Sequence, residues 1–366
     1  MPVEEKKKAL IAMSGGVDSS VAASLMVERG YECIGCTMKL FEASDSGEEI
    51  EERINEKACC ALENVEDAGS VARKLSIPYY VFNFKEEFRN CVIDKFVSCY
   101  ESGKTPNPCI DCNRFLKFKK LMQRAEELKC DVVVTGHYAR VSYDEAGGKY
   151  LLKKGLDEKK DQSYVLYALT QEQLAHIQFP LGEFDKPQVR EMAAERGFVN
   201  ANRPDSQDIC FVPNGDYASV IEEYSGKNFP PGDYVDLDGN PIGKHKGIIH
   251  YTIGQHKGLG VVFGEPRYVC AINPKENTVA LGRNEDLFSV YALAGDFNWI
   301  SGEVPKGEIR CKVKVRYKQK EQPATVKPVG EDRAEIIFDE PQRAITAGQA
   351  AVLYDGDVVL GGGTIL

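Results

Sequence analysis

Residues 8–20 read KALIAMSGGVDSS, and this stretch decides the fold. The apolar run at 8–13 predicts a buried strand, which ends directly in a serine and two glycines. Residues 17–29 predict a helix, because apolar side chains recur there at helical spacing and Gly30 follows as an end signal. A strand, a glycine turn and a helix in this order are typical of a parallel α/β sheet.

The turn between this strand and helix has the composition of a phosphate-binding loop. Its glycines let backbone N–H groups approach a ligand, and the helix start adds partial positive charge. Ser14, Ser19 and Ser20 can donate further hydrogen bonds, and Asp18 could hold a magnesium ion. An ordinary capped turn is the alternative, but it would not need so many serines. The turn lacks the Gly-Lys-Ser/Thr ending of a Walker loop and resembles the PP-loop of ATP pyrophosphatases, which cleave ATP between the α and β phosphates.

Strand-like and helix-like segments alternate over the first two hundred residues. Strands are predicted at 33–38, 79–83 and 131–135, and helices at 65–75, 84–100 and 115–128. After about Arg203, glycine and proline become frequent and strands become short, and Asp355–Gly356 predicts a hairpin. We therefore predict an α/β protein in three parts: a doubly wound parallel sheet at 1–203, a small β-rich domain at 204–282, and a C-terminal β-barrel at 283–366.

Composition limits the cellular location and the classes of partner that we expect for this protein. The 366 residues are 43% hydrophobic, without an apolar run long enough for a bilayer or a signal peptide. We expect a cytoplasmic protein without a membrane partner, in which the twelve cysteines stay reduced. The net charge of −10 argues against nucleic acid as a partner unless basic residues cluster locally.

Two such basic clusters occur. The first consists of Arg310, Lys312, Lys314, Arg316, Lys318 and Lys320. A strand would place these six cations on one face, where they favour RNA phosphate over the alternative of a solubilising edge. The second consists of Lys117, Lys119, Lys120 and Arg124, close to a cysteine-containing segment. We predict that both clusters bind RNA.

Two cysteines stand in unusual contexts. Cys112 lies in TPNPCIDCNR, residues 105–114, which falls between two predicted helices. We expect its thiol at the start of the following helix, a position that favours the thiolate, although inert packing is the alternative. Cys210, in DSQDICF at 205–211, reads by itself as a buried strand residue. Adjacent Cys59 and Cys60 splay apart in a chain, so we assign them to structure.

The whole chain resembles the MnmA/TrmU family of tRNA-specific 2-thiouridylases. The matching stretches are SGGVDSS at 14–20, TPNPCIDCNRFLKF at 105–118, TGHYAR at 135–140, KDQSY at 160–164, FPLGEFDKPQVR at 179–190, DSQDICF at 205–211, GQHKGLG at 254–260, VRYKQ at 315–319 and GQAAVLYDGDVVLGGG at 348–363. KDQSY and the pair of Cys112 and Cys210 distinguish this family from other PP-loop enzymes.

The resemblance implies the reaction and the roles of the residues. ATP would adenylate the C2 oxygen of the wobble uridine, and sulfur would then replace that oxygen. Cys112 would be the nucleophile, Cys210 would carry a persulfide, and the two would form a transient disulfide. The implied ATP contacts are Ala12, Met13, Ser14, Gly15, Gly16, Val17, Asp18, Ser19, Met38 and Gly136. The implied contacts to the target base or tRNA are Asn107, Pro108, Cys109, His137, Lys160, Asp161, Gln162, Arg316, Tyr317 and Gln349. The sulfur donor would be a cysteine desulfurase or a sulfur-relay protein.

One position departs from the family pattern. The usual motif reads Asn-Pro-Asp-x-x-Cys-Asn, whereas Cys109 stands here in place of the acid/base aspartate. Asp111 lies elsewhere in the loop, and we do not assign that role to it. Cys109, Cys112 and Cys210 could instead hold a 4Fe–4S cluster whose fourth iron carries sulfide. Zinc on three thiolates would provide no sulfur carrier.

Two different functions compete with tRNA thiolation. A PP-loop ligase or amidotransferase acting on a small metabolite would need an ammonia source and no basic strand. An RNA-binding module with a vestigial nucleotide site would not need the intact SGGVDSS turn at 14–20. Exchange of pyrophosphate into ATP that depends on tRNA would separate these two functions from thiolation.

Overall fold

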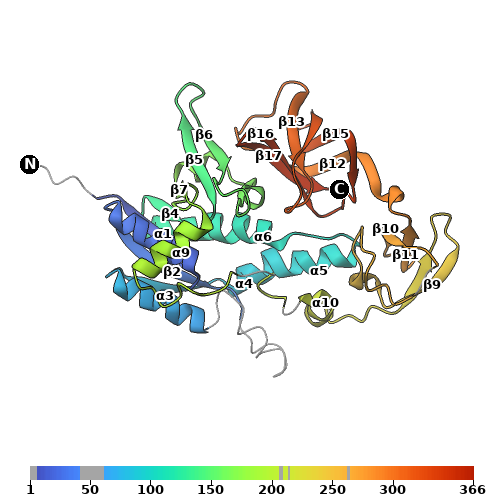
Figure 1. The fold of residues 1–366 in the computed structure, drawn as a ribbon, viewed down its shortest axis with the longest axis horizontal. Helices are drawn as coiled ribbons and strands as arrows, with labels where there is room; N and C mark the ends of the chain where they lie inside the picture. Colours follow the sequence, from blue (N-terminus) through green and yellow to red (C-terminus); the bar gives the residue numbers. More distant parts are fainter. Residues whose placement is uncertain (1–5, 42–61, 206–208, 213–214, 262–263) are drawn as a thin grey trace, which may run out of the picture.

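The computed structural model describes residues 6–41, 62–205, 209–212, 215–261 and 264–366 (Figure 1). An α/β unit occupies one end of the molecule, and a barrel and a small sheet lie toward the other end. The long helical segment that contains α5 runs between them. Cys59 and Cys60 lie outside the described residues. No helix in the described part of the chain is both long enough and apolar enough to cross a membrane.

The α/β unit is built on a five-stranded parallel sheet, as predicted. The strand order is β3-β2-β1-β4-β7. The strands are β1 (Lys8–Ala12), β2 (Glu32–Lys39), β3 (Tyr79–Asn83), β4 (Val132–Val134) and β7 (Ile177–Gln178). Ala9 and Ile11 of β1 pack into one core and Leu10 into another, so this strand is buried on both faces. Two-sided burial explains why its sequence is a continuous apolar run.

Helices cover both faces of this sheet. The first core includes residues of α1 (Val17–Glu28), α3 (Leu62–Lys74) and α9 (Lys186–Glu195). The second includes residues of two long helical segments that each change pitch. One comprises α4 (Lys85–Phe88), the π-helix η2 (Arg89–Ile93) and α5 (Asp94–Glu101), and the other comprises α6 (Pro108–Asp111), the π-helix η3 (Cys112–Lys120) and α7 (Leu121–Glu127).

The second helical segment corrects the prediction for Cys112. The helix was expected to begin after this residue, but it begins at Pro108. Asn107 caps it, because its side-chain oxygen accepts a hydrogen bond from the Cys109 N–H at 3.2 Å. Proline suits the first helical position, since its missing N–H would have no partner there. Cys109 therefore lies in the first turn, and Cys112 is the fifth helical residue.

The middle unit is a four-stranded sheet with the order β10-β11-β8-β9. Its elements are α10 (Tyr217–Ser225), β8 (Gly232–Val235), β9 (Pro241–His245), η6 (Ile248–His250), β10 (Tyr268–Asn273) and β11 (Thr278–Gly282). Tyr234 is fully buried and donates a hydrogen bond to the Leu259 carbonyl at 2.7 Å. Tyr217 of α10 packs against Phe96 and Tyr100 of α5, with ring centroids 6.3 and 6.2 Å apart, so this unit is attached to the α/β unit through aromatic contacts.

The C-terminal unit is a closed barrel of six strands. These are β12 (Phe288–Trp299), β13 (Ile309–Lys314), β14 (Gln322–Val329), β15 (Arg333–Arg343), β16 (Ala350–Asp355) and β17 (Val358–Ile365), and a short helix η7 (Glu285–Leu287) precedes them. Pairing of β12 with β17 closes the barrel, and the predicted hairpin joins β16 to β17. Strand β13 ends at Lys314. The prediction of six cations along one strand is therefore wrong, because the last three lie beyond its end.

A hairpin from the α/β unit extends the sheet of the barrel. It consists of β5 (Ala139–Asp144) and β6 (Lys149–Lys154), and Lys153 of β6 pairs with Val358 of β17. In Figure 1 this hairpin stands beside the barrel. The short helices η4 (Ser163–Leu166) and α8 (Gln171–Ala175) follow it. Residues 139–154 thus connect the first and last units of the chain.

Candidate active site

A cavity of about 340 Å³ lies at the carboxyl ends of β1, β2 and β4. The chain leaves β1 toward β2 on one side, while β4 lies on the other, and ligands of open α/β sheets bind at such a switch point. Of the predicted ATP residues, the cavity is lined by Ala12, Met13, Ser14, Asp18, Ser19, Met38 and Gly136. Of the predicted cysteine and tRNA residues, it is lined by Pro108, Cys109, Cys112, His137, Gln162 and Cys210. Segments distant in sequence thus meet in one site.

The PP-loop is held in shape by its own hydroxyls and by one distant asparagine. Ser19 Oγ accepts a hydrogen bond from the Ser14 N–H at 3.1 Å and donates to the Gly16 carbonyl at 3.0 Å. Asn200 is buried, and its Nδ2 donates to the Gly15 carbonyl at 2.7 Å. Gly15 has a φ of +75°, where a side chain would be strained. Of the three remaining predicted ATP residues, Gly15 and Gly16 form the turn, and Val17 is buried as the first residue of α1. Sequence reasoning missed Asn200.

Gly136 permits the close approach of β4 to the start of α1. A Cβ atom at this position would lie 2.9 Å from the Asp18 carbonyl carbon and from the Ser19 nitrogen. Backbone atoms of a helix start cannot move away as a flexible side chain can. The glycine is therefore needed for the two walls of the cavity to meet at this point.

Asp18 belongs to an ionic network that the sequence did not reveal. Its Oδ1 accepts hydrogen bonds from Lys186 Nζ at 2.6 Å and from the Tyr138 hydroxyl at 2.8 Å. Lys186 is buried and lies 2.8 Å from Asp205, which also pairs with Lys160 at 2.7 Å. The charge of Lys186 is thus shared between the PP-loop and the segment that leads to Cys210.

The pKa of Asp205 reflects this network. Burial by itself would raise the pKa, but hydrogen bonds from Lys160 and Lys186 lower it to about 2. Arg190 adds a third cation at 2.9 Å. Asp205 is therefore a carboxylate at neutral pH. Lys160, which was predicted to contact tRNA, is engaged with Asp205 in this structure.

The three thiols reach the cavity from two sides. Cys109 is exposed, and Cys112 and Cys210 are half-buried. Phe211 anchors the Cys210 side, because it is 2% exposed and meets the rings of Phe88 and Phe96 edge-on, at 5.6 and 5.2 Å. Within the described ranges, no three His, Cys, Asp or Glu side chains are grouped to hold a metal ion.

Asp111 lies outside the cavity that the thiols line. It is buried and accepts a hydrogen bond from Lys95 Nζ at 2.7 Å. It lines a separate small cavity of about 30 Å³ together with Arg114. Burial raises the pKa of Asp111, although Lys95 opposes the shift. The Asp111 side chain is thus paired with Lys95 and is not among the described residues that line the cavity of the thiols.

His137 is a neutral imidazole in the wall of the cavity. It is 7% exposed, lies between Phe118 and Phe179, and its Nδ1 is 2.6 Å from Thr135 Oγ1. Burial lowers the pKa of His137 far below its usual value, and the charge of Lys117 lowers it further. A neutral imidazole is suited to hydrogen bonding with a nucleobase rather than to ion pairing with phosphate.

A second cavity, of about 590 Å³, adjoins the first. Pro108 and Ile209 line both, and Asn107 and Gln349 line the second one. Gln349 comes from the barrel, and its Nε2 donates to the Thr105 carbonyl at 2.7 Å. The barrel therefore fixes the start of the cysteine-containing segment. Asn107 and Gln349, both predicted to contact the tRNA, lie together beside the candidate active site.

The other predicted tRNA residues lie outside both cavities, and each has a partner within the protein: Lys160 pairs with Asp205, and the Tyr317 hydroxyl donates to the Asp161 carbonyl at 3.3 Å. Asp161 is buried and accepts hydrogen bonds from the backbone of Gly155 and Ser163. Arg316 Nη2 donates to Ile253 of the middle unit and to Ala344 and Thr346 of the barrel. Tyr317 is 37% exposed, so its ring remains accessible.

The basic clusters are partly neutralised. Arg310 pairs with Asp339 at 2.7 Å, and Lys120 pairs with Glu87 at 3.3 Å. Lys314 lies over the Tyr354 ring, 5.8 Å from its centroid, and burial lowers its pKa. Fewer cations face solvent than the sequence predicted.

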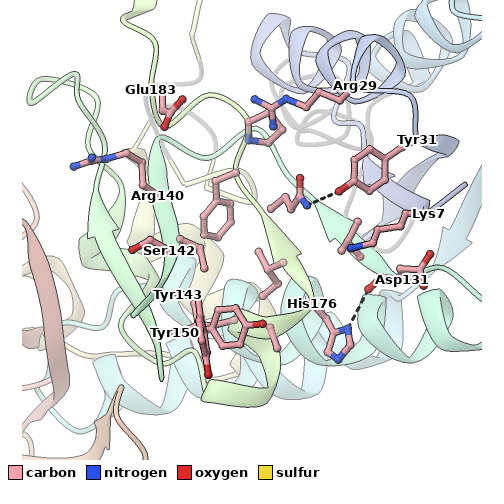
Figure 2. Close-up of a pocket in the computed structure, with 18 residues that line it drawn as sticks. Lys7, Arg29, Tyr31, Asp131, Arg140, Ser142, Tyr143, Tyr150, His176 and Glu183 are labelled. Atoms are coloured by element: carbon pink, nitrogen blue, oxygen red, sulfur yellow. Dashed lines mark hydrogen bonds between the residues drawn. The ribbon is translucent and has the colours of Figure 1, made fainter. Parts of the chain in front are cut away.

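A third cavity, of about 550 Å³, lies at the opposite end of the parallel sheet (Figure 2). Residues that precede the strands line it, including Lys7, Tyr31 and His176. Gln178 Nε2 donates to the Tyr31 hydroxyl at 2.9 Å. Figure 2 shows the hydrogen bond between His176 Nδ1 and the Asp131 carbonyl, at 3.0 Å. The described residues that line it include neither a residue of the PP-loop nor a cysteine. The candidate active site is therefore the cavity at the carboxyl ends.

Family models match three successive parts of the chain that correspond to the three units. Family models match residues 7–214 (tRNA methyl transferase HUP domain), 218–283 (tRNA methyl transferase PRC-barrel domain) and 291–365 (aminomethyltransferase beta-barrel domain). A solved 4-thiouridine synthetase–RNA complex with bound ATP is 19% identical, with a TM-score of 0.33, and the match covers 60% of this chain and 54% of that one.

Curated relatives match over nearly the whole length. The tRNA-specific 2-thiouridylase MnmA of Clostridioides difficile is 53% identical, and the match covers 98% of both chains. The MnmA of Acetivibrio thermocellus is 50% identical, with coverage of 98% of this chain and 99% of the relative. The chain therefore belongs to the MnmA family of tRNA-specific 2-thiouridylases.

Proposed function

We propose that this protein is an ATP-dependent tRNA-uridine 2-sulfurtransferase that converts the wobble uridine of its tRNA substrates to 2-thiouridine. One observation carries this proposal: a single cavity is lined by the PP-loop and by Cys109, Cys112 and Cys210. A nucleotide site and a thiol site in one cavity allow activation of a base oxygen and its replacement by sulfur without release of an intermediate. The names of the relatives support the same substrate.

In the first step, the C2 oxygen of uridine attacks the α-phosphate of ATP. A bond forms between this oxygen and phosphorus, pyrophosphate leaves, and the base is adenylated. N–H groups at the start of α1, with Ser14 and Ser19, would bind the phosphates. Bound magnesium would neutralise phosphate charge. Asp18, the one carboxylate among the described lining residues, suits it, because magnesium commonly takes one or two carboxylates plus phosphate and water.

In the second step, the terminal sulfur of a Cys210 persulfide attacks C2, and AMP leaves. Cys112 then attacks the Cys210 sulfur of the resulting adduct, which releases thiolated uridine and forms a Cys112–Cys210 disulfide. The two cysteines supply the two electrons, and an external reductant reopens the disulfide. The thiols of Cys112 and Cys210 line the same cavity, as this order of steps requires.

An iron–sulfur cluster on the three cysteines is the alternative sulfur carrier. The replacement of the usual aspartate by Cys109 favours it, whereas the arrangement of the described residues does not. Iron and sulfide assays on anaerobically purified protein, with Cys109→Ala alongside, distinguish the two mechanisms. Full activity of iron-free protein would exclude the cluster.

The proposed partners follow from the reaction. The macromolecular substrate is the anticodon stem-loop of tRNA, and the sulfur donor is a cysteine desulfurase or a sulfur-relay protein. The reaction would take place in the cytoplasm, where reducing systems regenerate the thiols. Asn107 and Gln349 in the adjoining cavity would contact the nucleotides around the target base.

Nucleoside mass spectrometry tests the proposal. The protein is incubated with unmodified tRNA, ATP, magnesium, and a cysteine desulfurase with cysteine as the donor of persulfide sulfur, and the digested tRNA is examined for 2-thiouridine. We expect the product only with ATP and not with Cys112→Ser. Absence of both 2-thiouridine and tRNA-dependent exchange of pyrophosphate into ATP would refute it. Exchange that depends on a small metabolite instead would indicate a ligase or an amidotransferase.

A further inference from the structure

The π-helix η3 places Cys112 and Lys117 on the same side of one helix. At its end, the N–H of Leu121 donates to the carbonyl of Leu116, five residues earlier. In an α-helix, side chains five residues apart point about 140° away from each other. In a π-helix, residues five apart are joined across one turn. This pitch explains why Cys112 and Lys117 both line the active-site cavity.

Lys117 is the one cation among the described residues that line this cavity. Its neighbours Lys120 and Arg124 pair with Glu87 and Glu127, at 3.3 and 2.5 Å. In the part of the chain that the structure describes, no ion pair engages Lys117. Its charge is felt inside the site, since it contributes to the lowered pKa of the buried His137. The sequence predicts Lys117 to be an RNA-binding lysine, whereas in the structure it lines the same cavity as the three thiols.

The helix start contributes little positive charge at Cys112. The helix begins at Pro108, and the influence of a helix terminus declines within the first turn. Cys112 is half-buried, which disfavours a thiolate unless a cation is close. A neighbouring lysine is one of the features that favour reactive thiolates in proteins.

We propose that Lys117 is the positioning residue that stabilises the thiolate of Cys112, and that the π-helix sets the register between them. Its part in catalysis rests on the proposed sulfur transfer. When the Cys112 thiolate attacks the Cys210 sulfur, negative charge moves onto the departing thiolated uridine. The ammonium of Lys117 favours the thiolate form of Cys112 at the start of this step. It does not itself form or break a covalent bond.

Alkylation of Cys112 as a function of pH tests the proposal. Full-length protein is treated with iodoacetamide, and the rate at Cys112 is read by peptide mass spectrometry, which separates it from other cysteines. Lys117→Met removes the charge and keeps the length, Lys117→Arg keeps the charge, and Lys119→Met removes an exposed charge of the same helix. We expect the pH of half-maximal alkylation to rise by about 1 in Lys117→Met only.

An unchanged profile in Lys117→Met, or an equal shift in Lys119→Met, would overturn the proposal. Loss of pyrophosphate exchange in Lys117→Met with an unchanged alkylation profile would assign the lysine to ATP phosphate instead. Circular dichroism of each variant verifies folding, and recovery of the profile in Lys117→Arg distinguishes charge from packing. Alkylation needs neither tRNA nor ATP, so this result stands apart from the 2-thiouridine assay that tests the proposed function.

Discussion

Lys186 Nζ lies 2.6 Å from Asp18 Oδ1, and these two residues are 168 positions apart in the chain. Lys186 is 7% exposed and holds Asp205 as well as Asp18. One buried lysine therefore joins the PP-loop to the segment that precedes Cys210. This relationship suggests that the nucleotide site and the sulfur site are positioned together.

Lys186→Met is expected to damage both folding and adenylation, because it leaves two partly buried carboxylates without their shared cation. We expect a loss of about 2 kcal/mol in the free energy of unfolding and a marked fall in tRNA-dependent pyrophosphate exchange. Urea unfolding and the exchange assay measure the two effects. Lys227→Met is the control, since its ion pair with Glu101 is exposed and contributes roughly 0–1 kcal/mol. Equal stabilities of the two variants would contradict the prediction.

Asp205 should make the free energy of unfolding depend on pH in the acidic range. Its folded-state pKa of about 2 is below the ordinary value of 3.8, so its contribution is complete above about pH 4 and disappears as the pH falls toward 2. We expect Asp205→Asn to be about 1 kcal/mol less stable than the wild type at pH 7, after allowance for solvent screening. Thermal unfolding from pH 7 to pH 3 checks this. A difference that stays constant down to pH 3 would contradict it.

Phe211→Ala should separate sulfur transfer from adenylation. Phe211 holds Cys210 through its contacts with Phe88 and Phe96, and truncating a buried phenylalanine costs about 3–5 kcal/mol. We expect 2-thiouridine formation to fall much further than pyrophosphate exchange, because the PP-loop lies elsewhere in the cavity. Phe211→Leu, which keeps an apolar side chain, should retain most of both activities. A parallel fall of both activities in Phe211→Ala would show general unfolding.

Lys312→Glu combined with Lys318→Glu should weaken tRNA binding. Both side chains are exposed, unlike those of Lys314 and Arg316, which are partly buried. We expect the affinity to fall and its dependence on salt to become shallower by roughly one counterion for each phosphate contact that is lost. Filter binding at several salt concentrations measures this. An unaltered salt slope would indicate that this face of the barrel points away from the RNA.

The sequence determined the parts of this protein that depend on neighbouring residues. The buried strand before the PP-loop, the strand at Tyr79–Asn83 and the hairpin after Asp355 follow from local apolar runs and turn residues. Asn107-Pro108 is also a local signal, because asparagine followed by proline is typical of a helix start. The implied site residues that line the cavity were identified by motif resemblance, which records residue types and not their contacts.

Only the tertiary structure decided the ion pairs between distant residues, the end of one strand and the pitch of one helix. The pairing of Lys186 with Asp18 and Asp205 joins segments that no periodicity connects, and β13 ends at Lys314 although the alternation of basic residues continues. The π-helical register of Cys112 and Lys117 is likewise absent from local patterns, since the same residues suit an α-helix in which they would face apart. Packing around the cavity fixes these features, because the free energy of a buried charge or a helix pitch depends on what surrounds it.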